Sequence, residues 1–318
     1  MPHNMNSKQL IRFRTNRKEG FFDKVTGRVV IPPKYFAVRP FREGRALFYD
    51  PASELWGFLD EDGNEICPPS FMEAEDFSEG MAAVFDQKNE RWGFIGPDGR
   101  FLIHPVFKNA HSFSEGLAPV LEKELWGYVS KDDHIEIGFQ FDLVHSFSDG
   151  YAWVFQGDEN YFIKKHGMKA INMDGYSIAD SFSDGLAPLF DKENRSYSFI
   201  DTSPKFAITG LPYAFVLGFH DGLAGVCTED RKKGFIDKSG KEVVPCIYDR
   251  ADSFKDGLSL VSKDNKFGFL DKHGDIVVPI IYSDALNCEG GVGAVLGKRG
   301  EVLYFNEKGE EIEVSGME

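Results

Sequence analysis

Eight acidic residues recur at nearly equal intervals along the chain, each one position before a glycine. They are Glu43, Glu79, Glu115, Asp149, Asp184, Asp221, Asp256 and Glu289. Such a row could bind divalent cations, but calcium takes roughly six to eight oxygen ligands and each repeat supplies one carboxylate. The alternative is turn chemistry, in which a carboxylate accepts nearby backbone N–H groups. We interpret these acids as turn residues and predict no metal site from them.

Histidines are concentrated in the middle of the chain, at His104, His111, His134, His145 and His166. Zinc requires three or four converging ligands. Only His111 and His145 occupy equivalent positions, each two residues before a phenylalanine. The motifs HExxH and GxSxG are missing, as is a nucleophilic cysteine in a cysteine–histidine context. We therefore assign no metal ligand, catalytic residue or cofactor, and we do not expect an enzyme.

The glycines that follow the acids show that the chain is a tandem repeat. They fall at 44, 80, 116, 150, 185, 222, 257 and 290, with steps of 33 to 37 residues. A constant step is typical of repeat proteins, in which each unit packs against its neighbours. Seven of the eight turns begin with phenylalanine, and Asn287 takes that position in the eighth. We expect these phenylalanines to lie in the core.

The copy at 233–261 shows the expected elements, with the sequence KGFIDKSGKEVVPCIYDRADSFKDGLSLV. A first strand leads into a hairpin turn, in which Asp237 can accept backbone N–H groups and Gly240 supplies a positive φ. We expect Pro245 to end the ladder pairing of the return strand. Strands near 248–254, 258–261, 267–270 and 276–279 together predict a four-stranded meander.

A glycine follows an aromatic residue inside one strand of many copies, as at Gly57 and Gly93. Such a glycine is costly unless something large lies across it, so we expect a neighbouring ring to cover these two. Copies four to six, about 126–214, depart most from the pattern. The return strand near Gly138 has no proline, the segment 170–175 has none either, and copy six displaces its proline to position 212.

The charge of the chain excludes some partners. Residues 1–18 hold five bases and no acid, which leaves 31 bases against 51 acids in the other residues, a net charge of −20. Such a surface repels phosphate backbones, so we expect no nucleic-acid partner. The N-terminus has no apolar secretory core, and Leu10, Ile11 and Phe13 fit a first strand. With no apolar run of about 18 residues and four scattered cysteines, we expect a cytoplasmic protein without a membrane span.

The copies KGFIDKSGKEVVPCIYDRADSFKDGLSLV, WGFIGPDGRFLIHPVFKNAHSFSEGLAPV and WGFLDEDGNEICPPSFMEAEDFSEGMAAV resemble the bacterial WG (KWG) repeat family. The resemblance covers about 19–314. It implies a β-rich repeat protein with an interaction role and supplies no catalytic residues.

Both faces of the expected strands carry apolar residues, so both must be covered by neighbours. Radial blades side by side satisfy this, and we predict an all-β, propeller-like array of about nine units of roughly 35 residues. An open superhelical solenoid of the same units is the alternative. We expect a basic segment at 1–18 that contributes a first strand and one repeat domain at 19–318.

We expect a non-catalytic scaffold that binds a protein partner. The alternatives are a propeller-type hydrolase or lyase, and a cell-wall or glycan-binding protein. Partner contact in a repeat protein falls on positions that differ between copies. Aromatic residues added in the divergent copies are therefore our partner-binding candidates, namely Phe139, Phe141, Tyr151, Trp153 and Tyr161. The competing interpretation is that these rings are buried.

Overall fold

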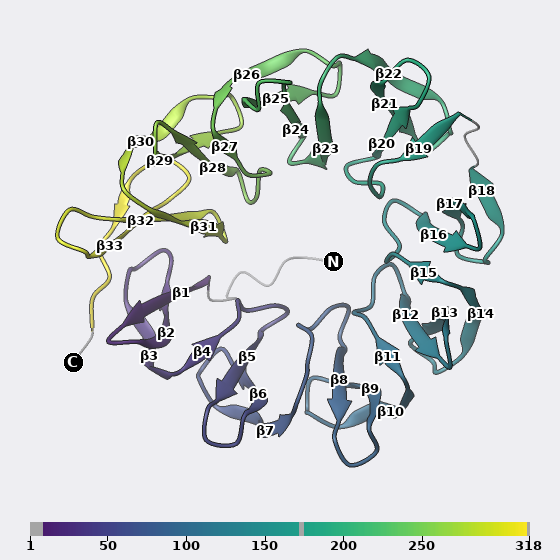
Figure 1. Ribbon diagram of the computed structural model, residues 1–318. Coiled ribbons are helices and arrows are strands. Elements are labelled where there is room, and N and C mark those ends of the chain that lie inside the picture. Colours follow the sequence, from purple (N-terminus) through teal and green to yellow (C-terminus); the bar gives the residue numbers. More distant parts are fainter. Residues whose placement is uncertain (1–8, 172–174, 317–318) are drawn as a thin grey trace. The chain divides into compact units, whose positions relative to one another are not determined.

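The computed structural model describes residues 9–171 and 175–316, which consist of strands and turns (Figure 1). The strands of this part form nine antiparallel sheets of three or four strands each, in sequence order. No helix long and apolar enough to cross a membrane occurs among these residues. The prediction of an all-β, propeller-like array of nine units is confirmed.

The chain divides into two compact units. Unit one comprises 1–147, 152–168 and 314–318, and unit two comprises 148–151 and 169–313. The expectation of one repeat domain over 19–318 stays a prediction.

Unit one contains the sheets of the first four copies and most strands of the next. Its first sheets are β1 (Leu10–Thr15), β2 (Lys18–Asp23) and β3 (Val29–Tyr35), then β4 (Ala37–Val38), β5 (Arg45–Asp50), β6 (Leu55–Asp60) and β7 (Glu65–Phe71). Next are β8 (Ala82–Asp86), β9 (Arg91–Ile95) and β10 (Phe101–Phe107), and then β11 (Asn109–Ala110), β12 (Leu117–Glu122), β13 (Leu125–Ser130) and β14 (Ile135–Phe141). The last strands are β15 (Leu143–Val144), β16 (Ala152–Gln156) and β17 (Glu159–Ile163).

Unit two begins with the short strand β18 (Lys169–Ile171) and continues with four complete meanders. These are β19 (Tyr176–Ile178), β20 (Leu186–Asp191), β21 (Ser196–Asp201) and β22 (Phe206–Leu211), then β23 (Phe215–His220), β24 (Leu223–Cys227), β25 (Lys233–Asp237) and β26 (Glu242–Tyr248). They are followed by β27 (Arg250–Ala251), β28 (Leu258–Lys263), β29 (Lys266–Asp271) and β30 (Ile276–Tyr282), and by β31 (Ala285–Glu289), β32 (Val292–Leu296), β33 (Val302–Phe305) and β34 (Glu311–Ile312). The segment 170–175, in which the sequence has no proline, includes residues 172–174, which lie outside the described residues.

The hairpin turn between β25 and β26 has the chemistry that its sequence predicts. The Oδ1 atom of Asp237 accepts the backbone N–H groups of Ser239 at 2.8 Å and Lys241 at 3.1 Å. Gly240 has a φ of +82°, in the left-handed region where glycine carries no side-chain penalty. The carboxylate thus replaces water as the acceptor for two turn amides.

The strand glycine that follows an aromatic residue is required by the backbone of the outer strand at both Gly57 and Gly93, whereas the expected ring is among the nearest atoms at Gly57 and not at Gly93. A Cβ atom on Gly93 would lie 2.7 Å from the carbonyl oxygen of Ile103 in the outer strand. At Gly57 the Cys67 carbonyl would lie at 2.6 Å, and there the Phe48 ring would also lie at 2.6 Å. The outer strand bulges across the glycine, because its register with the third strand shifts at this point.

The expected proline stop is wrong. Pro245 lies inside β26, which continues to Tyr248. The register between β25 and β26 shifts from Phe235↔Val244 to Lys233↔Tyr248, so the proline sits in a bulge of an edge strand, where a missing N–H costs no ladder bond.

Six of the seven turn phenylalanines are buried core residues, as predicted, and Phe41 is half-buried against the first apolar cluster. Phe113 and Phe147 are each 1% exposed and pack in separate apolar clusters of unit one. Leu10, Ile11 and Phe13 are buried in β1, which pairs with β2. At the other end of the chain, the Ser315 carbonyl accepts the Val29 N–H, and the Ser315 N–H donates to the Gly27 carbonyl, both at 2.9 Å. The last residues of unit one therefore extend its first sheet.

The eighth turn is shifted by one residue from the sequence alignment. The bridge Lys255↔Leu258 closes the seventh turn, and Glu289↔Val292 closes the eighth. Gly290 and Gly291 therefore occupy the acid and glycine positions, and the buried Cys288 replaces the phenylalanine. The assignments of Asn287 to the phenylalanine position and of Glu289 to the acid position were wrong. Two glycines, Gly290 and Gly291, follow each other here, and the sequence alone does not show which of them is the turn glycine.

Candidate functional site

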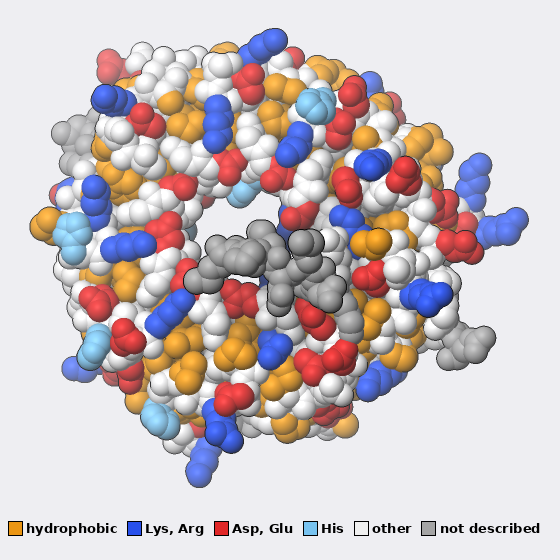
Figure 2. All heavy atoms as spheres, turned by 180° about the vertical axis from the view of Figure 1, so that it is seen from behind, with side chains coloured by type: hydrophobic (Ala, Val, Ile, Leu, Met, Phe, Trp, Pro, Cys, Tyr) orange, Lys and Arg blue, Asp and Glu red, His pale blue; other side chains and the backbone are white. Residues whose placement is uncertain are grey.

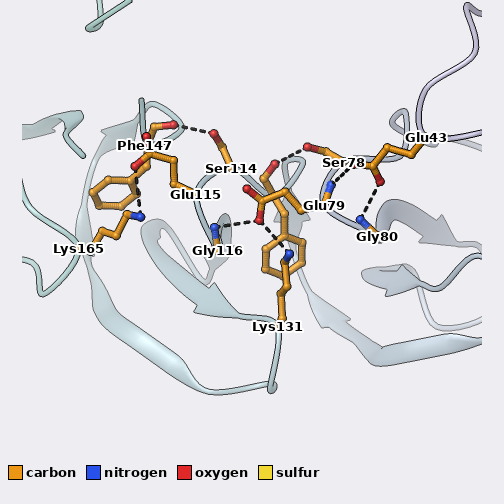
Figure 3. A network of polar contacts seen from close by, with 11 residues as sticks. Glu43, Ser78, Glu79, Gly80, Ser114, Glu115, Gly116, Lys131, Phe147 and Lys165 are labelled. Carbon is orange, nitrogen blue, oxygen red and sulfur yellow. Dashed lines mark hydrogen bonds and ion pairs between the residues drawn. The ribbon is translucent and has the colours of Figure 1, made fainter. Parts of the chain in front are cut away.

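The turn acids link successive repeats through the backbone. In the turn at 78–81, Glu79 and Gly80 both have positive φ, +54° and +87°, as in a two-residue type I′ hairpin. Their N–H groups point together and donate to Oε1 and Oε2 of Glu43, at 2.8 and 2.7 Å (Figure 3). Oε2 of Glu79 in turn accepts the Gly116 N–H at 2.9 Å. Each carboxylate of this pair thus holds the turn of the next copy.

The same contact recurs in unit two. Carboxylate oxygens of Asp149, Asp184 and Asp221 accept the N–H groups of Gly185, Gly222 and Gly257, at 2.7 to 2.8 Å. These acids are turn residues that accept backbone N–H groups, as predicted. The prediction did not include that the N–H groups belong to the next repeat.

Serine and lysine side chains reinforce this contact. Ser78 Oγ donates to the Phe113 carbonyl and Ser114 Oγ to the Phe147 carbonyl, both at 2.6 Å (Figure 3). Lys131 Nζ lies 3.0 Å from Glu79, and Lys165 Nζ lies 3.3 Å from Glu115. At the turns of Ser78 and Ser114, the phenylalanine, serine, acid and glycine therefore form the joint between copies.

The two equivalent histidines pack on tryptophans. His111 stacks on Trp126 with ring centroids 5.0 Å apart, and His145 stacks on Trp153 at 4.7 Å, both with planes 8° apart. Among the described residues no group of three or more His, Cys, Asp or Glu side chains is placed to hold a metal ion. These two rings serve as packing surfaces.

A row of unlike polar side chains crosses three copies of unit one, at the two positions before each phenylalanine. We call Arg39, Asp76, Glu75 and His111 the charged row. Arg39 Nη1 lies 3.7 Å from Asp76 Oδ1, and His111 Nδ1 lies 3.1 Å from Glu75 Oε1. Side chains of Arg39 and His111 are 41% and 45% exposed. The row is therefore held by polar contacts between copies and remains accessible from solvent.

Burial and pairing separate the two acids of the row. Burial raises the pKa of Asp76, and the guanidinium groups of Arg39, Arg42 and Arg12 offset this only in part. Burial also acts to raise the pKa of Glu75, but hydrogen bonds from His111 and Ser112 outweigh it and hold the pKa below its ordinary value. The two adjacent acids of the row therefore have pKa values displaced in opposite directions, Asp76 upward and Glu75 downward.

The five aromatic candidates do not form one exposed surface. Phe141, Tyr151 and Tyr161 are buried, at 1%, 6% and 7% exposure, so their interpretation as surface rings is wrong and the competing one holds. Phe139 is half-buried against the cluster around Phe113, and Trp153 is half-buried under His145. Tyr151 stacks on Phe182 at 4.9 Å and donates to the Thr202 carbonyl. On the face drawn in Figure 2, hydrophobic side chains are interspersed with charged ones.

Trp153 compensates for the loss of a tryptophan elsewhere. In the preceding copy Leu121 pairs with Trp126, whereas in this copy Phe155 pairs with Asn160. Trp153 lies on the adjacent strand, donates its Nε1–H to Asn160 Oδ1 at 3.3 Å and takes the histidine stack. The exchange keeps an indole beneath the histidine.

Comparison with known proteins supports this repeat unit. The model of the WG-containing repeat matches residues 20–49, 56–88, 92–126, 126–159, 234–267 and 267–296, more than half of the chain. The unmatched stretch 160–233 lies mostly within the copies that diverge most in sequence. No curated protein sequence matches the chain.

Solved structures with a similar fold have dissimilar sequences. A crystal structure of the eukaryotic initiation factor has 11% identity and a TM-score of 0.61, with 97% of this chain and 96% of that chain covered. AztD from Citrobacter koseri has 12% identity and a TM-score of 0.45, with 96% and 94% covered. BamB from Moraxella catarrhalis has 8% identity and a TM-score of 0.43, with 93% and 98% covered. At 11% identity the first of these shows the fold alone.

Proposed function

Because this chain belongs to the WG-containing repeat family, whose repeat builds the joint described above, we propose that it is a non-catalytic cytoplasmic scaffold that binds a protein partner. The observation that carries the proposal is that two sets of residues in the repeat have different roles. The repeated acids are engaged with the backbone of the next copy, as Glu43 is with Glu79 and Gly80. Residues that differ between copies, such as Arg39 and His111, take no part in this contact and remain partly exposed.

The charged row has the properties of a protein-binding surface. Its side chains are partly exposed, carry both signs of charge and are held in place by pairing between copies. Ordered charges of both signs select a partner with the complementary pattern and disfavour others. A fixed geometry also lowers the entropic cost of binding.

Affinity capture with the whole chain tests the proposal. The partner is identified by mass spectrometry, purified, and its Kd measured against the chain and against the triple variant Arg39→Ala, Glu75→Ala, His111→Ala. Lys88→Ala, Glu90→Ala, His104→Ala is the matched control, because it likewise removes one basic residue, one glutamate and one histidine, here from exposed positions of unit one.

We expect the row variant to bind at least tenfold more weakly and the control variant to bind unchanged. Far-UV circular dichroism and urea unfolding establish that both variants are folded. The proposal is wrong if no partner is captured reproducibly, or if the folded row variant binds as tightly as the control.

A further inference from the structure

The first described turn, Arg42–Arg45, differs from the later turns in what its amide groups contact. The glycine N–H groups at Gly80, Gly116, Gly185, Gly222 and Gly257 each donate to a carboxylate of the preceding copy. For Glu43 and Gly44, no acceptor of the backbone N–H groups occurs among residues 9–171 and 175–316. One repeat step earlier the sequence reads Asn6-Ser7-Lys8, and residues 1–18 contain no Asp or Glu.

The amide groups of this turn are nonetheless arranged for a carboxylate. Glu43 and Gly44 have φ values of +51° and +74°, close to the +54° and +87° of Glu79 and Gly80. The bridge Arg42↔Arg45 closes the turn as Ser78↔Met81 closes the next one. Two successive N–H groups in this conformation form a concave anion site, which in the next turn holds both oxygens of one carboxylate.

The side chains of this turn also favour an anion. Arg45 stands where the other acid-containing turns have an apolar residue, such as Met81 or Leu117. Its Nη1 donates to the Gly44 carbonyl at 2.9 Å and its Nε to the Pro97 carbonyl at 3.3 Å, which fixes the guanidinium beside the turn. Arg42 takes the position of Ser78 and is exposed.

Further arginines lie near this turn, in a chain with a net charge of −15. Arg12, Arg39 and Arg42 all lie close enough to Asp76 to act on its pKa. Glu61 lies on the Cα side of Gly44, with Oε1 3.7 Å from where a Cβ atom would stand. It makes no hydrogen bond to the Gly44 N–H, so it does not fill the place that Glu43 fills in the next turn.

We propose that the turn Arg42–Arg45 binds a Glu or Asp side chain of an acidic peptide segment in a protein partner. The two N–H groups take the carboxylate oxygens as Glu79 and Gly80 take Glu43, and Arg42 and Arg45 add positive charge. This inference rests on the scaffold function and names one of its contacts. Since the chain as a whole repels acidic peptides, the attraction is local to this turn.

The experiment follows the Gly44 amide by NMR in the full chain, deuterated and labelled with 15N-glycine. The probe is an acetylated, amidated peptide with the sequence of residues 77–82, which carries one Glu in its turn sequence. We expect the Gly44 resonance to shift and saturate, while Gly80 and Gly116, already bound to Glu43 and Glu79, stay in place. The same peptide with Gln instead of Glu should bind at least tenfold more weakly.

Variants separate this turn from general electrostatics. Arg42→Ser with Arg45→Met installs the residues of the next turn and should weaken peptide binding at least tenfold. If the double variant does not fold, Arg42→Ser alone, at an exposed position, provides the test and should also weaken peptide binding. Arg100→Ser removes an equal charge from a side chain that is 86% exposed and should leave binding unchanged.

Three results would overturn the proposal: a Gly44 resonance that the peptide does not move, a folded double variant that binds like the parent, or inorganic phosphate that binds more tightly than the peptide. A partner lost from the charged-row variant while Gly44 stays unmoved would leave the scaffold function standing and remove this site. A saturating Gly44 shift with no partner captured would support this peptide site and remove the support for the scaffold function.

Discussion

The carboxylate of Glu79 accepts a hydrogen bond from the backbone N–H of Gly116, 37 residues later in the sequence, at 2.9 Å. A residue whose neighbours suggest a local role in its own turn therefore makes a long-range contact between sheets. Burial acts to raise the pKa of Glu79, but Lys131 and the N–H groups of Gly116 and Glu115 hold it below its ordinary value. Those interactions belong to the folded state, so the ionised carboxylate stabilises the fold.

We expect Glu79→Gln to lower the free energy of unfolding by about 1.5–3 kcal/mol at pH 7, the usual cost of losing a charge-assisted hydrogen bond. A lowered folded pKa means that this stabilisation is complete above the unfolded pKa of about 4.3 and is lost as the pH falls through the folded value. Urea unfolding at pH 7 and at acid pH measures both. Glu136→Gln, at an exposed position of β14, is the control and should change stability by less than about 0.5 kcal/mol. A difference that grows toward acid pH would contradict the assigned role of the carboxylate.

Gly57→Ala should destabilise unit one by at least about 2 kcal/mol. Its Cβ atom would lie 2.6 Å from both the Cys67 carbonyl oxygen and the Phe48 ring, so the outer strand or the ring must move. Gly138→Ala is the matched control, because nothing lies within 4 Å of its Cβ position. Thermal and urea unfolding should show the control neutral or slightly stabilised. Equal effects at the two glycines would show that the outer strand is not held against Gly57.

Phe113→Ala should cost about 3–5 kcal/mol, the range for a buried aromatic ring. The ring is 1% exposed and lies 4.8 Å from the Phe94 ring, centroid to centroid. Leu102→Ala, at a side chain that is 52% exposed, should cost far less. A change below about 1 kcal/mol at Phe113, read from urea midpoints, would be incompatible with a core position.

Asp76→Asn should remove a pH dependence of the opposite sign from that of Glu79. Because burial raises the folded pKa of Asp76, the folded state keeps its proton to higher pH than the unfolded state does. Stability of the parent relative to the variant should therefore fall as the pH rises from about 3.9, the unfolded value, through the folded pKa. Urea unfolding between pH 3.5 and 7 gives the difference. A flat or rising difference would show that Arg39, Arg42 and Arg12 outweigh burial.

The repeat and its strands could be predicted from the sequence because the signals are local. The alternation of strand and turn residues, the glycine step and the turn chemistry of Asp237 and Gly240 depend on neighbours along the chain. Contacts between copies left no such signal. Glu79 binds the Gly116 N–H, and the Ile103 carbonyl requires Gly93. Both contacts depend on the register between strands or sheets, which cannot be read from residues that are neighbours along the chain.

The candidate site was predicted less well for a related reason. Extra aromatic residues in divergent copies suggested a binding surface, but Tyr151 and Tyr161 fill space that other copies fill differently. Tyr161 pairs with Val154 as Gly127 pairs with Val120, so in its copy Tyr161 takes the place of the glycine found in the third strand of the preceding copy. The charged row carried a weak signal, since its positions vary most in charge between Arg39, Glu75 and His111. Only the pairing between copies shows that these side chains lie together.

The pairing of Ser315 with Gly27 and Val29 has a consequence for how the protein is made. A ribosome releases the first sheet long before it releases residue 315, so β1, β2 and β3 wait for this neighbour while the intervening repeats are made. Since domains otherwise begin to fold from the N-terminus during synthesis, this sheet should be completed only after residue 315 has emerged. A chain that stalls before residue 315 would present an open edge on its first sheet, available to chaperones and proteases.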